Sequence, residues 1–522
     1  MRKIFVLFLI VWGLCVVHFN YAKGGESSFF SGDSLLYTLR LKRAAVSNFA
    51  IPFAQEQYAT HLLYSVLPSH GAITVGKDDY QKQNPRYIQE GTSKREWQTS
   101  AETFLKKGAI AAFTKAGYGN ALLGGVALNH SDDYQLLAPF VMGDTVAQQN
   151  RNRESYFFSG GFARKYNLWN WGINASYKAV ISSFYVDPRP KNLTTCFQLS
   201  PSVGFVLGDH CAVIVYGTAG TYKQSNEVLF MSELGVPSEY HFLGLSQDYY
   251  RFRGNNTENF YKGYLYSAGL DLLPVDRKRK TSFFAGVRWQ LFAFDKILKN
   301  LNQLSMAQMH TGAITSEAGL QTRLSQESIL GIKGSYRCER RVGTVFMYGD
   351  AAAGIYPRIA SLPLYESLLH HIKSEFMAEY MRGSWYGLLS CRVDYETLQR
   401  RLLHPQESVG IAVLKESVLA RIGRTFDHWA LEAEMEGCLS QPHSRKNILD
   451  VHPTKHSLQA QVDELVRSFE HNSKRAYSWQ IGVRCSRSVM GKFVASVFMQ
   501  WQNTRIASQN NHYLNWGIEF FF

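Results

Sequence analysis

The chain has 522 residues, of which 45% are hydrophobic, 14% aromatic and 19% charged, with 41 Gly and 14 Pro. This composition excludes wholesale disorder, and no apolar run after the N-terminal segment is long enough for a membrane-spanning helix. The formal charge of +14 suits anionic lipid, an anionic solute or nucleic acid, and expected export makes nucleic acid the least suitable partner.

The N-terminal residues predict export. Arg2 and Lys3 precede an apolar run over 4–17, and Ala22 is a small residue suited to cleavage. This order is typical of a secretory signal peptide over residues 1–22, because the apolar run is short for a membrane span. We therefore expect a mature protein that is translocated and not retained by a helix.

Residues 23–95 do not alternate cleanly between apolar and polar side chains. We interpret them as either a periplasmic lead-in or a plug that enters the lumen of a barrel, and the lead-in is the simpler alternative. Residues 96–522 form the second unit, whose pattern is that of a β-barrel.

From about residue 96 onward, apolar and polar residues alternate over long stretches. In 169–181, for example, Trp169, Trp171 and Ile173 alternate with Asn170 and Asn174. The period of two is typical of strands with one apolar face, and the stretches approach the ten or so residues that cross a bilayer. A soluble β-sandwich would also alternate, but its strands are shorter.

Two further features favour a membrane barrel over a sandwich. Aromatic residues crowd the expected strand ends, as in 156–158 and at Trp169 and Trp171. Counted back from the C-terminus, short connections at 487–491, 426–427, 273–280, 208–209 and 167–168 alternate with long ones at 440–474, 295–313, 223–258 and 129–154. We predict an all-β fold, a transmembrane antiparallel barrel of roughly 14–16 strands with short periplasmic turns and longer extracellular loops.

Two segments fit this pattern less well. Residues 349–381 form a long segment on the side of the short turns, and 363–381 spaces its apolar residues like a helix face. Residues 456–471 show the same helical spacing within a long connection. We expect a short helix at 456–471 and treat 363–381 as a second helical candidate.

The chain ends in HYLNWGIEFFF, an alternating strand. Its apolar face consists of Leu514, Trp516, Ile518, Phe520 and Phe522. A final strand of this kind, ending in Phe, resembles the signal by which the barrel-assembly machinery recognises outer-membrane barrels. The alternative is a buried terminal strand in a soluble sheet.

Charged residues are expected on the lumen side of the strands near the C-terminus. Glu432, Glu434 and Glu436 would project inward from one strand, with Arg484 on the next strand and Arg421 on the preceding one. They could form a constriction that selects a solute, or a network of ion pairs that holds strand register. We favour the network.

No motif for catalysis, cofactor binding or metal binding is recognisable. The chain has no Walker loop, no HExxH and no dinucleotide fingerprint. The adjacent pairs His130–Ser131, His443–Ser444 and His456–Ser457 lack a nucleophile motif. Six cysteines outside the signal peptide lack CxxC or Cys/His metal spacing, and whether Cys196 and Cys211 pair across one turn stays open. We predict no catalytic residues, no cofactor and no metal.

Three short stretches carry a resemblance to a known family. They are SDDYQLLAPFVMGD at 131–144, YFFSGGFARKY at 156–166 and DPRPKN at 187–192. They resemble an uncharacterised outer-membrane β-barrel family of Bacteroidota, most clearly between residues 108 and 210. The resemblance implies a barrel in the outer membrane, and it implies no reaction and no catalytic residues.

The leading hypothesis is a non-enzymatic, integral outer-membrane barrel that acts as a channel or transporter for a small or hydrophobic solute. The second is an outer-membrane assembly or docking component. The third, a lipid-modifying enzyme, would need Ser or His clustered with an acid at the membrane rim. We expect contacts with outer-membrane lipid and lipopolysaccharide and none with nucleic acid, and the sequence does not identify a solute.

Overall fold

The computed structural model describes residues 58–65, 69–83, 85–144, 148–208, 210–231, 239–254, 258–275, 280–352, 354–448, 459–489, 493–506 and 509–522, with backbone only at 444–448. The predicted signal peptide and residues 23–57 lie outside these ranges. Among the helices in these ranges, none is both long and apolar enough to cross a membrane.

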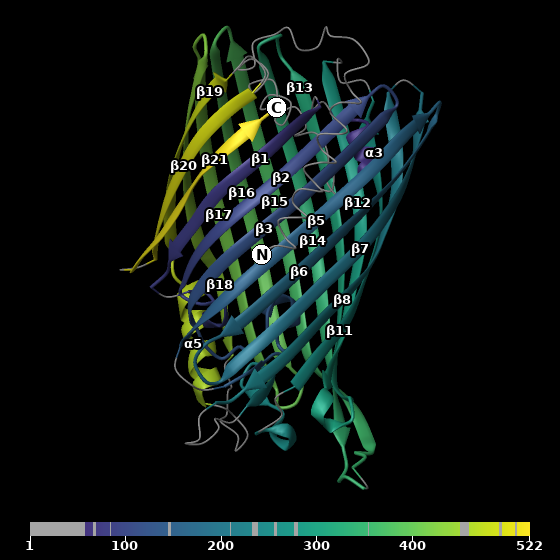
Figure 1. The fold of residues 1–522 in the computed structure, drawn as a ribbon, viewed down its shortest axis with the longest axis vertical. Helices are drawn as coiled ribbons and strands as arrows, with labels where there is room; N and C mark the ends of the chain where they lie inside the picture. Colours follow the sequence, from purple (N-terminus) through teal and green to yellow (C-terminus); the bar gives the residue numbers. More distant parts are fainter. Residues whose placement is uncertain are drawn as a thin grey trace.

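The described residues form one closed antiparallel barrel of 18 strands, drawn in Figure 1 as a tall cylinder of tilted strands. The barrel strands are β1 His70–Gln81, β2 Ser93–Lys107, β3 Ile110–Val126, β5 Gln149–Tyr166, β6 Trp169–Phe184, β7 Arg189–Leu207, β8 Cys211–Leu229, β11 Glu258–Pro274, β12 Thr281–Leu298, β13 Leu304–Arg323, β14 Ser328–Tyr348, β15 Arg358–Arg382, β16 Trp385–Leu402, β17 Glu407–Thr425, β18 Trp429–Ile448, β19 Ala476–Val489, β20 Phe493–Ile506 and β21 Gln509–Phe521.

Each strand pairs with the next along the barrel, and β21 also pairs with β1, which closes the cylinder. Closure is required in lipid, because an open edge would leave backbone N–H and C=O groups without partners. One smaller element, α3 Ala59–Leu62, precedes β1, and the others lie between the strands. They are η4 Ile88–Glu90, α4 Tyr134–Leu137, β4 Met142–Gly143, β9 Tyr240–Gly244, β10 Gln247–Asp248, η5 Tyr250–Phe252, η6 Lys299–Leu301 and α5 Gln459–Asn472.

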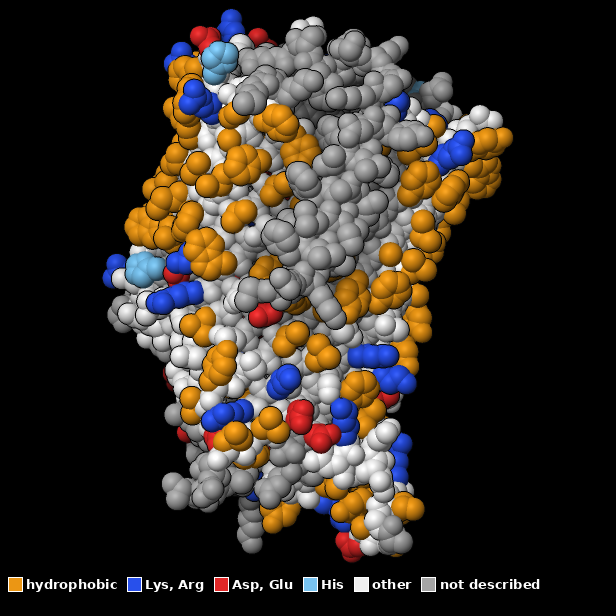
Figure 2. Space-filling view, in the orientation of Figure 1, with side chains coloured by type: hydrophobic (Ala, Val, Ile, Leu, Met, Phe, Trp, Pro, Cys, Tyr) orange, Lys and Arg blue, Asp and Glu red, His pale blue; other side chains and the backbone are white. Residues whose placement is uncertain are grey.

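The predicted alternation is confirmed on the barrel wall. Trp169, Trp171 and Ile173 of β6 expose 57%, 47% and 42% of their surface outward, whereas Asn170 and Asn174 are buried on the inner side. Figure 2 shows hydrophobic side chains spread over the wall, with charged side chains gathered toward its lower part and along its top edge. An apolar outer face is what lipid requires of a spanning barrel, and the chain is an integral outer-membrane β-barrel.

The predicted asymmetry of the connections is also confirmed. One end carries short turns such as 167–168 and 383–384, and the other carries the connections 127–148, 230–257 and 449–475. In outer-membrane barrels the short turns face the periplasm. The long-loop end, at the bottom of Figure 1, is therefore extracellular.

Several details of the sequence prediction are wrong. The barrel has 18 strands and not 14–16, because β1 lies within 23–95 and β15 takes up most of 349–381. The helical candidate 363–381 is part of β15, where pairing with β14 and β16 overrides helical spacing. The expected long connection 295–313 is mostly strand, and the aromatic residues 156–158 lie in the middle of β5. The helix expected at 456–471 is confirmed as α5.

Candidate functional site in the barrel lumen

Residues 58–65 lie inside the lumen at the short-turn end, where they pack against the inner wall. The amide of Ala59 donates to Asn174 Oδ1 at 3.2 Å, and Lys106 Nζ donates to the carbonyl of Ser65 at 2.7 Å. His61 is fully buried, with its Nε2 2.7 Å from Asp271 Oδ2. These contacts hold residues 58–65 against the inner wall. Residues 23–57 lie outside the described ranges, and the choice between a lead-in and a plug for 23–95 stays a prediction.

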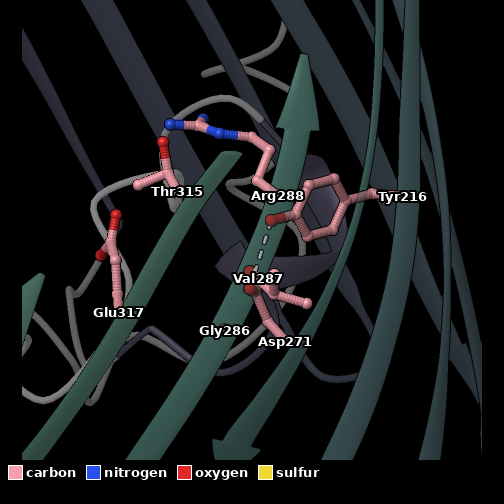
Figure 3. A pocket seen from close by; sticks show the side chains of 7 residues that line it. All are labelled: Tyr216, Asp271, Gly286, Val287, Arg288, Thr315 and Glu317. Carbon is pink, nitrogen blue, oxygen red and sulfur yellow. Dashed lines mark hydrogen bonds between the residues drawn. The ribbon is translucent and has the colours of Figure 1, made fainter. Parts of the chain in front are cut away.

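A small recess lies beside this segment on the wall formed by β8, β11, β12 and β13 (Figure 3). Tyr216 donates to Asp271 Oδ1 at 3.2 Å, and its ring packs on Tyr58 with centroids 3.9 Å apart. The other lining side chains include Arg288, Thr315 and Glu317. The aromatic stack and the Asp271 contacts tie residues 58–65 to the barrel wall.

Two connections fold into the long-loop end of the lumen, and we call them the first plug loop (127–144) and the second plug loop (239–254). β4 of the first pairs with β9 of the second, and β9 pairs with β10, so the loops share a three-stranded sheet separate from the barrel. This small sheet closes part of the extracellular mouth.

The plug loops and the inner wall share an apolar core. Its buried members include Leu137, Phe140, Val141, Phe242, Leu243 and Leu245 from the loops, with Tyr222, Tyr261, Phe292, Phe294, Met306 and Met309 from the strands. Burying one large apolar side chain contributes about 1.5–3 kcal/mol. The loops are therefore packed inside the barrel as a folded plug.

Buried polar side chains of the wall hold the first plug loop. Arg151 of β5, 3% exposed, donates to the carbonyls of Ser131 at 2.9 Å and Asn129 at 2.8 Å. Asn192 of β7 and Asn226 of β8 both donate to the carbonyl of His130, at 2.7 and 2.8 Å. Four side-chain bonds from three strands thus fix residues 129–131.

The second plug loop is held in a similar way by the opposite side of the barrel. Glu407 of β17 accepts from the amide of Ser246 at 3.2 Å, from Gln247 Nε2 at 3.1 Å and from the hydroxyl of Ser246. Tyr249 donates to the carbonyl of Phe346 at 2.8 Å. Hydrogen bonds from charged or polar residues of the wall therefore hold both plug loops in place.

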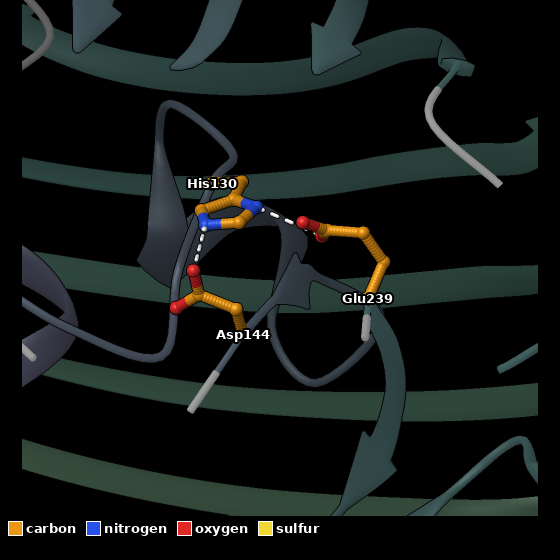
Figure 4. Close-up of side chains that lie close together, drawn as sticks. All are labelled: His130, Asp144 and Glu239. Atoms are coloured by element: carbon orange, nitrogen blue, oxygen red, sulfur yellow. Dashed lines mark hydrogen bonds and ion pairs between the residues drawn. The ribbon is translucent and has the colours of Figure 1, made fainter. Parts of the chain in front are cut away.

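A buried ionisable cluster joins the two plug loops (Figure 4). His130 Nδ1 lies 2.9 Å from Glu239 Oε2, and His130 Nε2 lies 3.4 Å from Asp144 Oδ2. Burial lowers the pKa of His130, but the carboxylates of Glu239 and Asp144 outweigh it and raise the pKa from 6.5 to about 9. His130 is therefore an imidazolium at neutral pH unless another cation replaces its proton.

The structure also shows the surroundings of the adjacent His–Ser pairs found in the sequence. Both ring nitrogens of His130 face carboxylates, and the Ser131 hydroxyl lies 3.2 Å from the hydroxyl of Tyr261, so this pair does not form a nucleophile with its base. The ring of His443 lies 6.0 Å from that of Tyr395. His456 and Ser457 lie outside the described residues, as does the side chain of Ser444.

The acidic residues predicted from the sequence lie on the inner face of β18. Glu432 and Glu434 expose 12% and 14% of their side chains, whereas Met435, the residue after Glu434, exposes 60% outward. Arg421 of β17 donates to Glu434 at 2.8 Å, and its Nε lies 3.9 Å from Glu432. Glu436 occupies the next inward position on this strand.

Arg484 of β19 stands opposite Glu432 in the strand register, but its guanidinium pairs with Glu519 of β21. Sequence spacing indicates that Arg484 lies on the strand next to the acidic residues, and it does not indicate this pairing across β20. The charged residues of this wall thus form two ion pairs, Arg421–Glu434 and Arg484–Glu519.

The C-terminal strand closes the barrel. Trp516, Ile518 and Phe520 expose 37%, 40% and 46% outward, and Leu514 and Phe522 are half-exposed. Phe522 and Gly71 exchange two backbone hydrogen bonds, of 2.9 and 3.0 Å. The alternating apolar face therefore meets lipid at the closing seam of the cylinder.

The cysteines with described side chains are all free. Cys196 of β7 lies opposite Tyr222 of β8, and Cys211 lies opposite Leu207, so the two residues are far apart along the same strand pair. Cys196 and Cys211 therefore do not pair in this fold.

α5 covers part of the extracellular mouth. Ser468 donates to the carbonyl of Arg86 at 2.7 Å, and Glu464 accepts from the amide of Ile88 at 3.3 Å. Partial burial, followed by the nearby charges of Arg467 and Lys474, lowers the pKa of His471 from 6.5 to about 4. Protonation of His471 is therefore unfavourable while α5 is packed.

This lowered pKa predicts that α5 loosens in acid. An undocked His471 binds its proton near pH 6.5, so packing becomes less stable as the pH falls from about 6.5 to about 4 and changes little below that range. We expect hydrogen-exchange protection factors in α5 to be lower at pH 5 than at pH 7. His471→Gln is the control and should flatten this difference, and an unchanged pH dependence in that variant would assign it to other groups.

Residues 59–522 match the family of unknown function DUF6850. The chain belongs to this family. No curated protein matches the sequence.

The chain is similar to several solved structures at low identity, among them the following three. The ferric preacinetobactin receptor BauA of Acinetobacter baumannii is 9% identical, with a TM-score of 0.39 and coverage of 87% of this chain and 80% of that one. FpvA of P. aeruginosa, bound to a pyoverdine, is 10% identical with a TM-score of 0.41 and coverage of 87% and 72%. The copper transporter OprC is 8% identical with a TM-score of 0.39 and coverage of 87% and 83%.

Proposed function

We propose that the chain forms a pathway for a small polar or charged solute across the outer membrane, partly closed in this state by its own plug loops. One observation carries the proposal: a wall of charged side chains faces the lumen on the side that the plug loops leave accessible. His371 and Arg392 on the inner face of β15 and β16 keep 33% and 38% of their side chains exposed, and Arg421 of β17 keeps 28%.

The size of the barrel supports this proposal. Barrels of about 8 strands fill their interior with side chains, whereas barrels of 16–18 strands leave room for water. An 18-stranded barrel therefore needs either a wet lumen or a plug, and under this proposal the chain has both. Because the accessible wall carries both signs of charge, a hydrophobic solute is less well matched than a polar one.

The export, assembly and membrane contacts of the chain are also inferences. We infer that residues 1–22 are a cleaved signal peptide and that the strand 514–522 is recognised by the barrel-assembly machinery. The outer face would contact lipid and, near its extracellular end, lipopolysaccharide. The Bacteroidota origin implied by the resemblance stays a prediction, and we infer a non-enzymatic role.

The lumen acids provide the test. In planar bilayers, replacing Glu432, Glu434 and Glu436 together by Gln should shift the reversal potential in a salt gradient toward anion selectivity, because three negative charges leave the pathway. A matched control removes three carboxylates outside the lumen, with Glu327→Gln, Asp350→Asn and Asp427→Asn. If both triple variants give the same reversal potential as the unaltered protein, these acids do not line the pathway.

A docking role is the second candidate, and the shape of the extracellular rim favours it. The connection between β14 and β15 projects beyond the barrel (Figure 1), and Arg251 donates to the carbonyl of Gly349 at 2.7 Å and to Asp350 at 2.9 Å. An ordered projection of this kind suits a partner. Absence of any conductance, including in a variant whose plug loops are released, would favour docking over transport.

A further inference from the structure

The two carboxylates that face His130 are buried and lie close to each other. The side chains of His130, Asp144 and Glu239 expose only 4%, 5% and 0% of their surface, and a ligand atom from each lies within 4.8 Å of the others. Two carboxylates this close inside a protein are costly unless a cation lies near them. One imidazolium balances only one of the two negative charges.

A second cationic side chain, Lys296, lies nearby but does not pair directly with either carboxylate. Lys296 lies near enough to Glu239 to interact with it electrostatically, but its ammonium donates to the carbonyl of Val141 at 3.0 Å. Glu239 Oε1 is buried without a hydrogen-bond partner in the described structure. The cluster therefore retains acceptor capacity that a second cation could use.

A second histidine lies on the same ribbon but outside the cluster. His241 is completely buried, and neither of its ring nitrogens has a hydrogen-bond partner among the described residues. His241 pairs with Met142 between β9 and β4, two positions along the ribbon from Glu239 and Asp144. Among the described residues, the ligand atoms that lie close enough together for one ion come from His130, Asp144 and Glu239.

We propose that His130, Asp144 and Glu239 form a binding site for a first-row divalent cation of the zinc type. Two ligands each about 2.1 Å from one tetrahedral ion stand about 3.4 Å apart, and His130 Nε2 and Asp144 Oδ2 are 3.4 Å apart. Glu239 Oε2 already contacts Nδ1 of His130 at 2.9 Å, and its other oxygen, Oε1, is the buried one without a partner. A divalent ion that replaced the His130 proton would balance both carboxylates.

The proposed ion would join the two plug loops at one end of their shared sheet, next to β4 and β9. Asp144 and His130 belong to the first loop, and Glu239 belongs to the second. Mixed nitrogen and carboxylate ligands suit zinc, manganese or iron better than calcium, which prefers oxygen alone. This site stands on its own geometry and does not depend on whether the barrel transports a solute.

Metal titration of the full-length protein in detergent, after treatment with EDTA, tests this site. We expect one Zn²⁺ per chain by calorimetry, weaker binding of Mn²⁺ and little of Ca²⁺. Asp144→Asn and Glu239→Gln should each weaken Zn²⁺ binding by about tenfold or more. Asp133→Asn is the matched control, since Asp133 lies on the same loop but pairs with Arg153 and Lys178. It should bind Zn²⁺ as the unaltered protein does.

Folding of each variant is checked by its heat-modifiable mobility on electrophoresis. As a second measurement, Cu²⁺ replaces Zn²⁺, and its paramagnetic resonance spectrum should lose a nitrogen coupling in His130→Gln. No binding of Zn²⁺ or Mn²⁺ by the folded, unaltered protein would overturn the proposal. Equal Zn²⁺ affinity in the folded Asp144→Asn and Asp133→Asn variants, or stronger binding of Ca²⁺ than of Zn²⁺, would overturn it as well.

Discussion

Deletion of Phe522 is expected to lower the amount of assembled barrel in the outer membrane severalfold. The amide and carbonyl of Phe522 bond to Gly71 on β1, and its ring lies 6.3 Å from that of Phe493 on β20. Two lost backbone bonds and a half-buried aromatic ring together cost about 2–4 kcal/mol. These interactions stabilise the pairing of β21 with β1, which closes the barrel. If this pairing opened, the edges of both strands would be exposed to lipid.

Heat-modifiable mobility of outer-membrane fractions measures the assembled barrel in this experiment. Phe521→Ala is the matched control, because Phe521 faces the other side of β21 and the substitution keeps the terminal backbone bonds with Gly71. Gly71→Val is a second variant, since a Cβ at Gly71 would overlap the ring of Phe522. Normal assembly of the chain without Phe522 would refute a role for this residue in closure or recognition.

Arg151→Met is expected to release the first plug loop and open the extracellular mouth. The substitution removes both donors to the carbonyls of Asn129 and Ser131 while keeping an apolar stem beside Phe184. A buried carbonyl left without a donor costs about 1–3 kcal/mol, so the pair costs about 2–6 kcal/mol. We expect larger single-channel conductance and faster proteolysis within residues 127–144.

Arg189→Met serves as the comparison for Arg151→Met. Arg189 also stands near the extracellular rim, but its guanidinium is 41% exposed and pairs with Asp187 at 2.7 Å. Exposed pairs of this kind contribute at most about 1 kcal/mol, so conductance and proteolysis should stay as in the unaltered protein. Arg151→Met protein with unaltered conductance and protease resistance would show that other contacts suffice to hold the plug.

The candidate site was only partly predictable from the sequence. The inward position of Glu432 and Glu434 follows from alternation alone, and the structure places both on the inner face. The sequence did not predict that Arg484 pairs with Glu519, because Glu519 lies two strands away in the barrel. The sequence also did not predict the cluster of ionisable residues in the plug loops, because His130 and Glu239 are 109 positions apart and belong to no motif.

The sequence by itself determined which side of each regular strand meets lipid, as at Trp169 and Asn170, and which strand ends the barrel. That information is local, because a period of two sets the face of every residue on a strand and lipid tolerates only the apolar face. Tertiary structure alone decided the strand number, the extended form of 363–381 and the inward folding of the plug loops. These features depend on backbone pairing and packing between segments far apart in the chain, which local spacing does not contain.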